Sequence, residues 1–137
     1  MSRDTGPFHM SSTCVRLRPD ASVEALTIGE SFWAELGRGE LGSFQNEYLV
    51  TTQSFAQHWP MWEMHPMGDE IIVLLSGSVE LILEKQNGHR VLPLNNAGEW
   101  VLVPKGVWHT ARVSTPSTVL FITAGEGTLH RPVDIFA

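Results

Sequence analysis

From Glu47 onward, short strand-forming stretches alternate with turn residues, and this pattern restricts the fold more than any other feature of the chain. The stretches are rich in Val, Ile, Leu and Thr, and Gly, Pro or Asn returns about every eight to twelve residues. This spacing is typical of a β-sandwich or a closed barrel, not of alternating strands and helices. Within it, the Asn87-Gly88 pair predicts a tight two-residue hairpin turn, because both residues tolerate positive φ.

The chain of 137 residues fits one domain. We expect residues 1–13 to form a flexible N-terminal tail and residues 14–137 to form a single β-barrel domain. Short strands are expected at 15–17 and 22–28, and a short helix over 31–36, capped by Ser31 and ended by Gly37. The later strands are expected over 48–53, 59–65, 70–75, 79–84, 91–94, 99–103, 107–113 and 118–123.

The composition excludes several classes of function. A net charge of −6 with only nine Lys and Arg residues excludes a nucleic-acid binder, which needs clustered positive charge, and a basic membrane-binding patch. Neither a membrane span nor the apolar core of a signal peptide is visible, so we expect a cytoplasmic protein. The one cysteine, Cys14, excludes a disulfide framework, and we expect it to be a buried or idle thiol.

Several ionisable residues fall on strand faces that otherwise look interior. Residues two apart in a strand share a face, so Glu63 and His65 lie with Met61. By the same rule Glu70 lies with Ile72 and Leu74, and His109 with Ala111 and Val113. An interior carboxylate or imidazole is costly unless it is paired or bound to a metal. Either these groups converge on a metal ion, or they hydrogen-bond to one another or to water in a metal-free barrel.

The segment around His109 resembles a known motif. Gly98-x5-Pro104-x-Gly106-x2-His109 is similar to the second motif of the cupin superfamily, except that Val113 stands where the motif closes with Asn. This resemblance implies an all-β, double-stranded β-helix or jelly-roll barrel, here with a short N-terminal helix. The residues around His109, and those around His65 described next, resemble the corresponding sequences of small bacterial single-domain cupins of the cupin 2, RmlC-like type.

The segment around His65 resembles the first cupin motif. Glu63-x-His65-x4-Glu70-x6-Gly77 has its spacing, although Gln57 replaces the opening Gly and Glu63 replaces the first His. Cupins usually hold a divalent metal with three His and one Glu. The resemblance therefore implies that Glu63, His65, Glu70 and His109 are the metal ligands here. Two carboxylates suit Mn²⁺ or Fe²⁺, with Zn²⁺ and Ni²⁺ as alternatives.

Glu63 has three alternative roles: a direct ligand, a hydrogen-bond partner of a ligating imidazole, or an acid or base beside the metal. His130 and His58 are further candidates at the barrel mouth, whereas we expect His89 to be solvated. We expect Met61, Met64 and Met67 to fill the core, and Trp62 and Trp108 to lie outside the barrel, where a dimer contact would cover them.

The resemblance implies a metal-binding protein with a small-molecule ligand, but it names no substrate. The enzyme hypotheses are an isomerase or lyase that uses the metal as a Lewis acid, and a dioxygenase that uses iron. The alternative is a non-catalytic module that binds or senses a small molecule, with or without metal. Ile71, Val73 and Leu75 form an apolar outer face, covered either by the N-terminal segment or by a second subunit, so we expect a homodimer.

Overall fold

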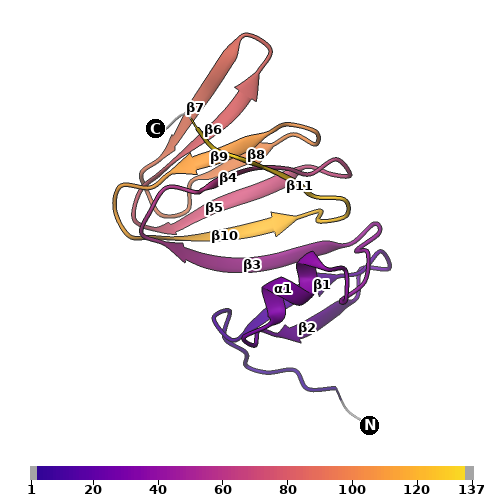
Figure 1. Ribbon diagram of the computed structural model, residues 1–137. Helices are drawn as coiled ribbons and strands as arrows, with labels where there is room; N and C mark the ends of the chain where they lie inside the picture. Colours follow the sequence, from indigo (N-terminus) through magenta and orange to yellow (C-terminus); the bar gives the residue numbers. More distant parts are fainter. Residues whose placement is uncertain (1–2, 135–137) are drawn as a thin grey trace.

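The computed structural model describes residues 3–134, which form two antiparallel sheets that face each other (Figure 1). The six-stranded sheet has the order β2 (Val23–Thr27), β1 (Thr13–Leu17), β3 (Tyr48–Phe55), β10 (Ser117–Thr123), β5 (Glu70–Ser76) and β8 (Trp100–Val103). The five-stranded sheet has the order β11 (Leu129–Pro132), β4 (Met61–Met64), β9 (His109–Arg112), β6 (Val79–Lys85) and β7 (Gly88–Leu94). The predicted all-β jelly-roll is confirmed.

The main core lies between the two sheets. Cross-strand partners point to the same side of a sheet, so Ile72 of β5 shares the inner face with Phe121 of β10 and Val101 of β8. Leu81 on β6 and Ala111 on β9, also partners, come from the other sheet. All five side chains are buried in one apolar cluster. This inner face continues into the positions of the predicted site residues Glu70 and His109.

The N-terminal third extends the six-stranded sheet and builds a second, smaller core. Helix α1 (Phe32–Gly37) packs near β1 and β3 (Figure 1). Cys14, Phe32, Phe44 and Leu49 form a buried cluster there. Cys14 is buried as predicted, and burial raises the pKa of its thiol to about 11. None of the described residues belongs to a helix that is long and apolar enough to cross a membrane.

The turn after β5 explains the glycine that closes the first motif. Gly77 has a φ of 88°, in the left-handed region. A Cβ atom at this position would lie 2.2 Å from the Ser117 hydroxyl oxygen and 2.6 Å from the Pro116 carbonyl oxygen. The close packing of this turn against the start of β10 therefore requires glycine.

Some local predictions were wrong. Strand β11 was missed, and the hairpin between β6 and β7 turns one residue earlier than predicted, because Lys85 pairs with Gly88 around residues 86–87. Ser31 makes no capping hydrogen bond, because its hydroxyl instead donates to the Glu35 carboxylate at 2.6 Å.

Two side-chain environments also differ from prediction. Met67 is 59% exposed, in a turn, instead of filling the core. Trp62 does face away from the core cluster, but the chain itself buries it: its ring lies against His89 and beneath the Arg131 guanidinium. Trp62 therefore needs no second subunit to cover it, and His89, although exposed, contacts this ring.

Candidate metal centre

The four predicted ligands come together at one end of the space between the sheets. Glu63 lies on β4, His65 follows that strand, Glu70 begins β5 and His109 begins β9. Glu63 and His109 are direct partners across β4 and β9. His65, Glu70 and His109 are buried, with exposed fractions of 4%, 2% and 0%, whereas Glu63 is only partly buried.

The donor atoms of these side chains face one another. His109 Nε2 lies 2.9 Å from Glu70 Oε1, and His65 Nε2 lies 3.4 Å from Glu70 Oε2 and 3.8 Å from Glu63 Oε2. Glu63, His65 and His109 each offer a donor atom within 4.8 Å of the others, a separation that suits one shared ion. Ligands bound about 2.1 Å from an ion lie about 3–4 Å apart, so these donors are close to coordination distances.

The backbone fixes which nitrogen of His109 faces the site. Nδ1 of His109 lies 3.2 Å from the Val107 carbonyl oxygen, which only accepts hydrogen bonds. Nδ1 therefore carries the proton in the neutral ring, and Nε2 presents a lone pair to Glu70 and the site. A ligating imidazole is usually oriented in this way by a carbonyl behind it.

Thr128 has the corresponding role behind His65. The Thr128 hydroxyl donates to the Gly125 carbonyl oxygen at 2.8 Å, so it is left to accept a hydrogen bond from His65 Nδ1, also at 2.8 Å. His65 Nε2 then presents a second lone pair to the site. Thr128 lies in the turn before β11, which the sequence patterns did not predict as structured.

The Glu70 carboxylate is ionised and oriented. Thr123 donates a hydrogen bond to Glu70 Oε2 at 2.6 Å. Burial raises the pKa of Glu70, but the contacts with His109 and His65 lower it further, to about 2. For His109, burial lowers the pKa, while the neighbouring Glu70 carboxylate raises it above its usual value, and the increase dominates.

Glu63 lies on the open side of the group. Its Oε2 faces His65, while its Oε1 lies 3.5 Å from Nε2 of His130, the partner of Glu63 across β4 and β11. His130 was expected just beyond the last strand, and the structure instead places it on a strand beside the site. His58 also lines the site's cavity, where its Nδ1 accepts a hydrogen bond from the Val113 backbone N–H.

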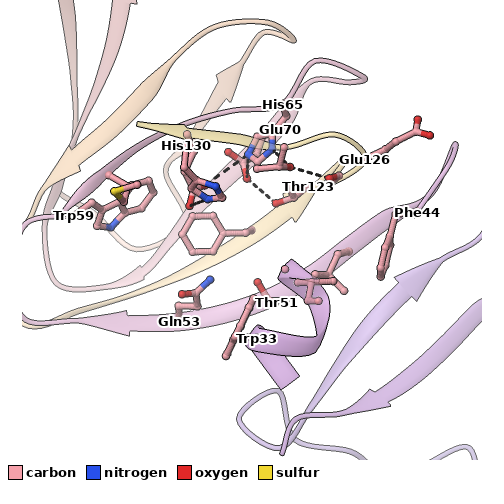
Figure 2. Close-up of a pocket in the computed structure, with 18 of the residues that line it drawn as sticks. Trp33, Phe44, Thr51, Gln53, Trp59, His65, Glu70, Thr123, Glu126 and His130 are labelled. Atoms are coloured by element: carbon pink, nitrogen blue, oxygen red, sulfur yellow. Dashed lines mark hydrogen bonds and ion pairs between the residues drawn. The ribbon is translucent and has the colours of Figure 1, made fainter. Parts of the chain in front are cut away.

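A cavity of about 1040 Å³ opens from these residues toward the N-terminal helix. Figure 2 shows His65, Glu70 and His130 on one side of it, and Trp33 of α1 with Gln53 of β3 on the other. The predicted small-molecule pocket therefore adjoins the predicted ligands. The part that sequence patterns missed is its far wall, which residues of α1 and the following loop supply.

Comparison with known proteins yields similarity in structure only. No protein-family model matches the sequence, and no curated protein is significantly similar to it. The solved structures include peruvianin-I, a cysteine peptidase from Thevetia peruviana latex, with a TM-score of 0.53 and 10% identity over 64% of this chain and 57% of that chain. Recombinant oxalate oxidase in complex with glycolate matches with a TM-score of 0.51 and 17% identity, over 60% of this chain and 45% of that one.

A cupin-2 domain protein from Shewanella frigidimarina has a TM-score of 0.44 and 21% identity, over 55% of this chain and 68% of that one. The chain spans less than two thirds of peruvianin-I and of oxalate oxidase. At these identities the likeness concerns the fold. Two facing antiparallel sheets, with both motif segments meeting between them, give this chain a jelly-roll fold similar to that of oxalate oxidase.

Proposed function

We propose that the chain holds a divalent metal ion with His65, Glu70, His109 and Glu63, and presents it to a small, oxygen-bearing molecule in the adjoining cavity. One observation carries this proposal: His65 Nε2, Glu70 Oε1 and His109 Nε2 are buried, face one another and make no hydrogen bond of normal geometry within residues 3–134.

A cation explains why these atoms face each other. Two imidazole lone pairs pointing at a carboxylate repel it, and the low dielectric of a buried site makes that repulsion expensive. A proton on one ring relieves part of it, as the raised pKa of His109 indicates. A divalent ion relieves all of it at once, because it accepts electron pairs from every donor.

The donor set, two nitrogens and two carboxylates, suits Mn²⁺ or Fe²⁺, and it also accommodates Zn²⁺ or Ni²⁺. In an octahedral ion, four protein ligands leave two positions for water or substrate. Glu63 is the ligand on the cavity side, and His130 lies against its second oxygen. When bound, the metal supplies Lewis acidity for an isomerase or lyase reaction, or oxygen chemistry if it is iron.

The cavity next to the site supports an enzyme more than a closed sensing or structural site, because Glu63, His65 and Glu70 are part of its lining. Turnover distinguishes the two classes. A metal-dependent reaction that stops with a chelator and returns with one metal supports an enzyme. Tight binding of a ligand without turnover supports the binding module.

The first test is elemental analysis of protein purified without a metal-affinity tag and reconstituted with Mn²⁺, Fe²⁺, Ni²⁺ or Zn²⁺. We expect about one ion per chain in the wild type and in His89→Ala, whose imidazole lies outside the site. The double variant His65→Ala/His109→Ala should retain none. Wild-type protein that takes up none of the four metals would overturn the proposal.

We also propose that the protein is a homodimer. The outer face of the six-stranded sheet exposes Leu75, Trp100 and Leu102 by 42%, 56% and 49%. Ile71 and Val73 of β5 lie on this same face, since they pair with Leu102 and Trp100. Among the residues that the structure describes, the N-terminal segment contacts β3, where Thr52 donates a 3.5 Å hydrogen bond to the Met10 carbonyl. A second copy of this face is therefore the cover that we propose.

A further inference from the structure

The charges around the cavity disfavour anionic ligands. Its lining contains no Lys or Arg among the described residues, but it contains the carboxylates of Glu63, Glu70 and Glu126. A divalent ion is balanced by Glu63 and Glu70 alone, and Glu126 then leaves the cavity negative. A ligand with its own carboxylate would add like charge to a partly enclosed space, where charges are weakly screened.

Arg16 does not alter this balance. It lies behind the cavity wall, where it donates to the Glu47 carboxylate at 2.6 Å and to the Leu41 carbonyl oxygen at 2.7 Å. Its guanidinium covers the Phe44 ring from 4.3 Å. These contacts engage the guanidinium, and they hold Phe44 as part of the wall.

Aromatic side chains supply much of the remaining surface. Phe55, Trp59 and Phe121 form a continuous group beside the metal ligands, with centroid separations of 5.4 Å for Phe55–Trp59 and 5.8 Å for Trp59–Phe121. Trp33, on α1, and Phe44 line the same cavity from the N-terminal part of the chain (Figure 2). Such walls favour a flat ring over an aliphatic chain, because rings stack on rings.

The polar groups opposite the metal ligands are uncharged. Thr51 and Gln53 of β3 line the far side of the cavity (Figure 2), where they offer a hydroxyl and an amide. Both groups can donate and accept hydrogen bonds, so they suit hydroxyl or carbonyl substituents. They add no positive charge that would offset a carboxylate on the ligand.

From this arrangement we infer that the cavity selects an uncharged, ring-bearing molecule that offers a hydroxyl or carbonyl oxygen to the metal. Two residues determine this specificity. Trp33 supplies an aromatic ring on which the ring of the ligand stacks, and Gln53 supplies a neutral amide where a cation would favour an anionic ligand. The inference rests on the proposed metal site and names the class of molecule that this site takes.

Three matched probes test it on metal-loaded protein by isothermal titration calorimetry. 2-Hydroxyacetophenone is a neutral ring with a hydroxyl and a ketone on neighbouring carbons, salicylate has the same ring and hydroxyl with a charged carboxylate in place of the ketone, and acetylacetone has two oxygen donors without the ring. We expect 2-hydroxyacetophenone to bind at least about tenfold more tightly than either of the others, a difference of about 1.4 kcal/mol in binding free energy.

Substitutions in the wall separate the two effects. Trp33→Ala should weaken 2-hydroxyacetophenone binding about tenfold while metal content is unchanged, and Trp33→Phe should restore most of the loss. Gln53→Lys introduces a cation and should reverse the preference toward salicylate. Ordered folding of each variant is checked by its circular dichroism spectrum and by its metal content.

The outcomes are distinguishable. Protein that takes up no metal contradicts the proposed function itself. Protein that binds metal but binds salicylate as tightly as 2-hydroxyacetophenone overturns this inference alone. If acetylacetone binds as tightly as the ring-bearing probe, or Trp33→Ala binds all probes as the wild type does, the aromatic walls do not select the ligand, and the inference is also wrong.

Discussion

The orientation of single side chains decides whether this barrel can bind a metal. Val107 and Thr128 each engage Nδ1 of a histidine, and each thereby turns an Nε2 lone pair toward Glu70. Neither residue touches the proposed ion. In the proposed metal site they hold His109 and His65 in one tautomer and one orientation, which would reduce the entropy lost on metal binding.

Thr128→Val tests this contribution. It keeps the size of the side chain but removes the acceptor for His65 Nδ1, so we expect metal affinity to fall about 10- to 100-fold. Thr128→Ser retains the hydroxyl and should bind as the wild type does. Competition titration against a chromogenic chelator measures both affinities. Equal affinity in the valine variant would show that the Thr128 hydroxyl does not orient His65.

Glu63 is the residue at which this chain departs from the usual cupin ligand set. If it is a direct ligand, Glu63→His restores three imidazoles and should raise the affinity for Ni²⁺ or Zn²⁺ relative to Mn²⁺. Glu63→Gln should weaken all four metals, because the amide carries no charge. Dialysis against each metal, followed by elemental analysis, measures the preference. Wild-type affinity in both variants would place Glu63 outside the ligand set.

At the scale of elements, the N-terminal wall depends on an ion pair behind it. Glu47 accepts hydrogen bonds from Arg16 and Arg18, and the hydrogen bond from Arg16, more than any other contact, lowers the pKa of its carboxyl. This pair links β1 to the loop before β3, whose backbone includes Phe44 at a φ of 58°. The loop that carries Phe44 into the cavity is thus anchored at its end.

The lowered pKa of Glu47 predicts a pH dependence. A carboxylate with a lowered pKa in the folded state stabilises the fold above its unfolded pKa, about 4.5, and loses this contribution as the pH falls through its folded value. We expect Glu47→Gln to lower the Tm at pH 7, and the difference from wild type to shrink below about pH 4.5. Scanning calorimetry of both proteins measures it.

Glu24→Gln is the control for this series, since Glu24 pairs with Arg18 at an exposed position. It should differ little from wild type at any pH, because exposed ion pairs contribute little. A constant Tm difference between Glu47→Gln and wild type from pH 7 to pH 3 would mean that the Glu47 charge does not stabilise the loop.

The barrel elements were predictable because their signals are local. The alternation in β5, Glu70–Ser76, and the ligand spacing around His65 need no tertiary information. Strand β11 has no such signal: Leu129–Pro132 is short and ends in proline, and pairing with β4 makes it a strand. That pairing brings His130 to Glu63. Likewise nothing local indicates that Trp33 faces the cavity, because the docking of α1 decides it.

For the whole molecule, the apolar outer face of the six-stranded sheet predicts assembly. The wild type should sediment as a dimer at micromolar concentration, and Leu102→Glu should give monomers by placing a charge in the interface. Leu129→Glu is the matched control: Leu129 is also 49% exposed but lies on the other sheet. A monomeric wild type, or a dimeric Leu102→Glu variant, would contradict this interface.

The cavity has two walls from different parts of the chain. The four proposed ligands lie between residues 63 and 109, whereas the wall opposite them comes largely from residues 33–55. The ion and the shape of the ligand are therefore specified independently. Replacing residues 30–46 on an unchanged barrel would therefore change the small molecule that the cavity binds, while the same metal stays in place.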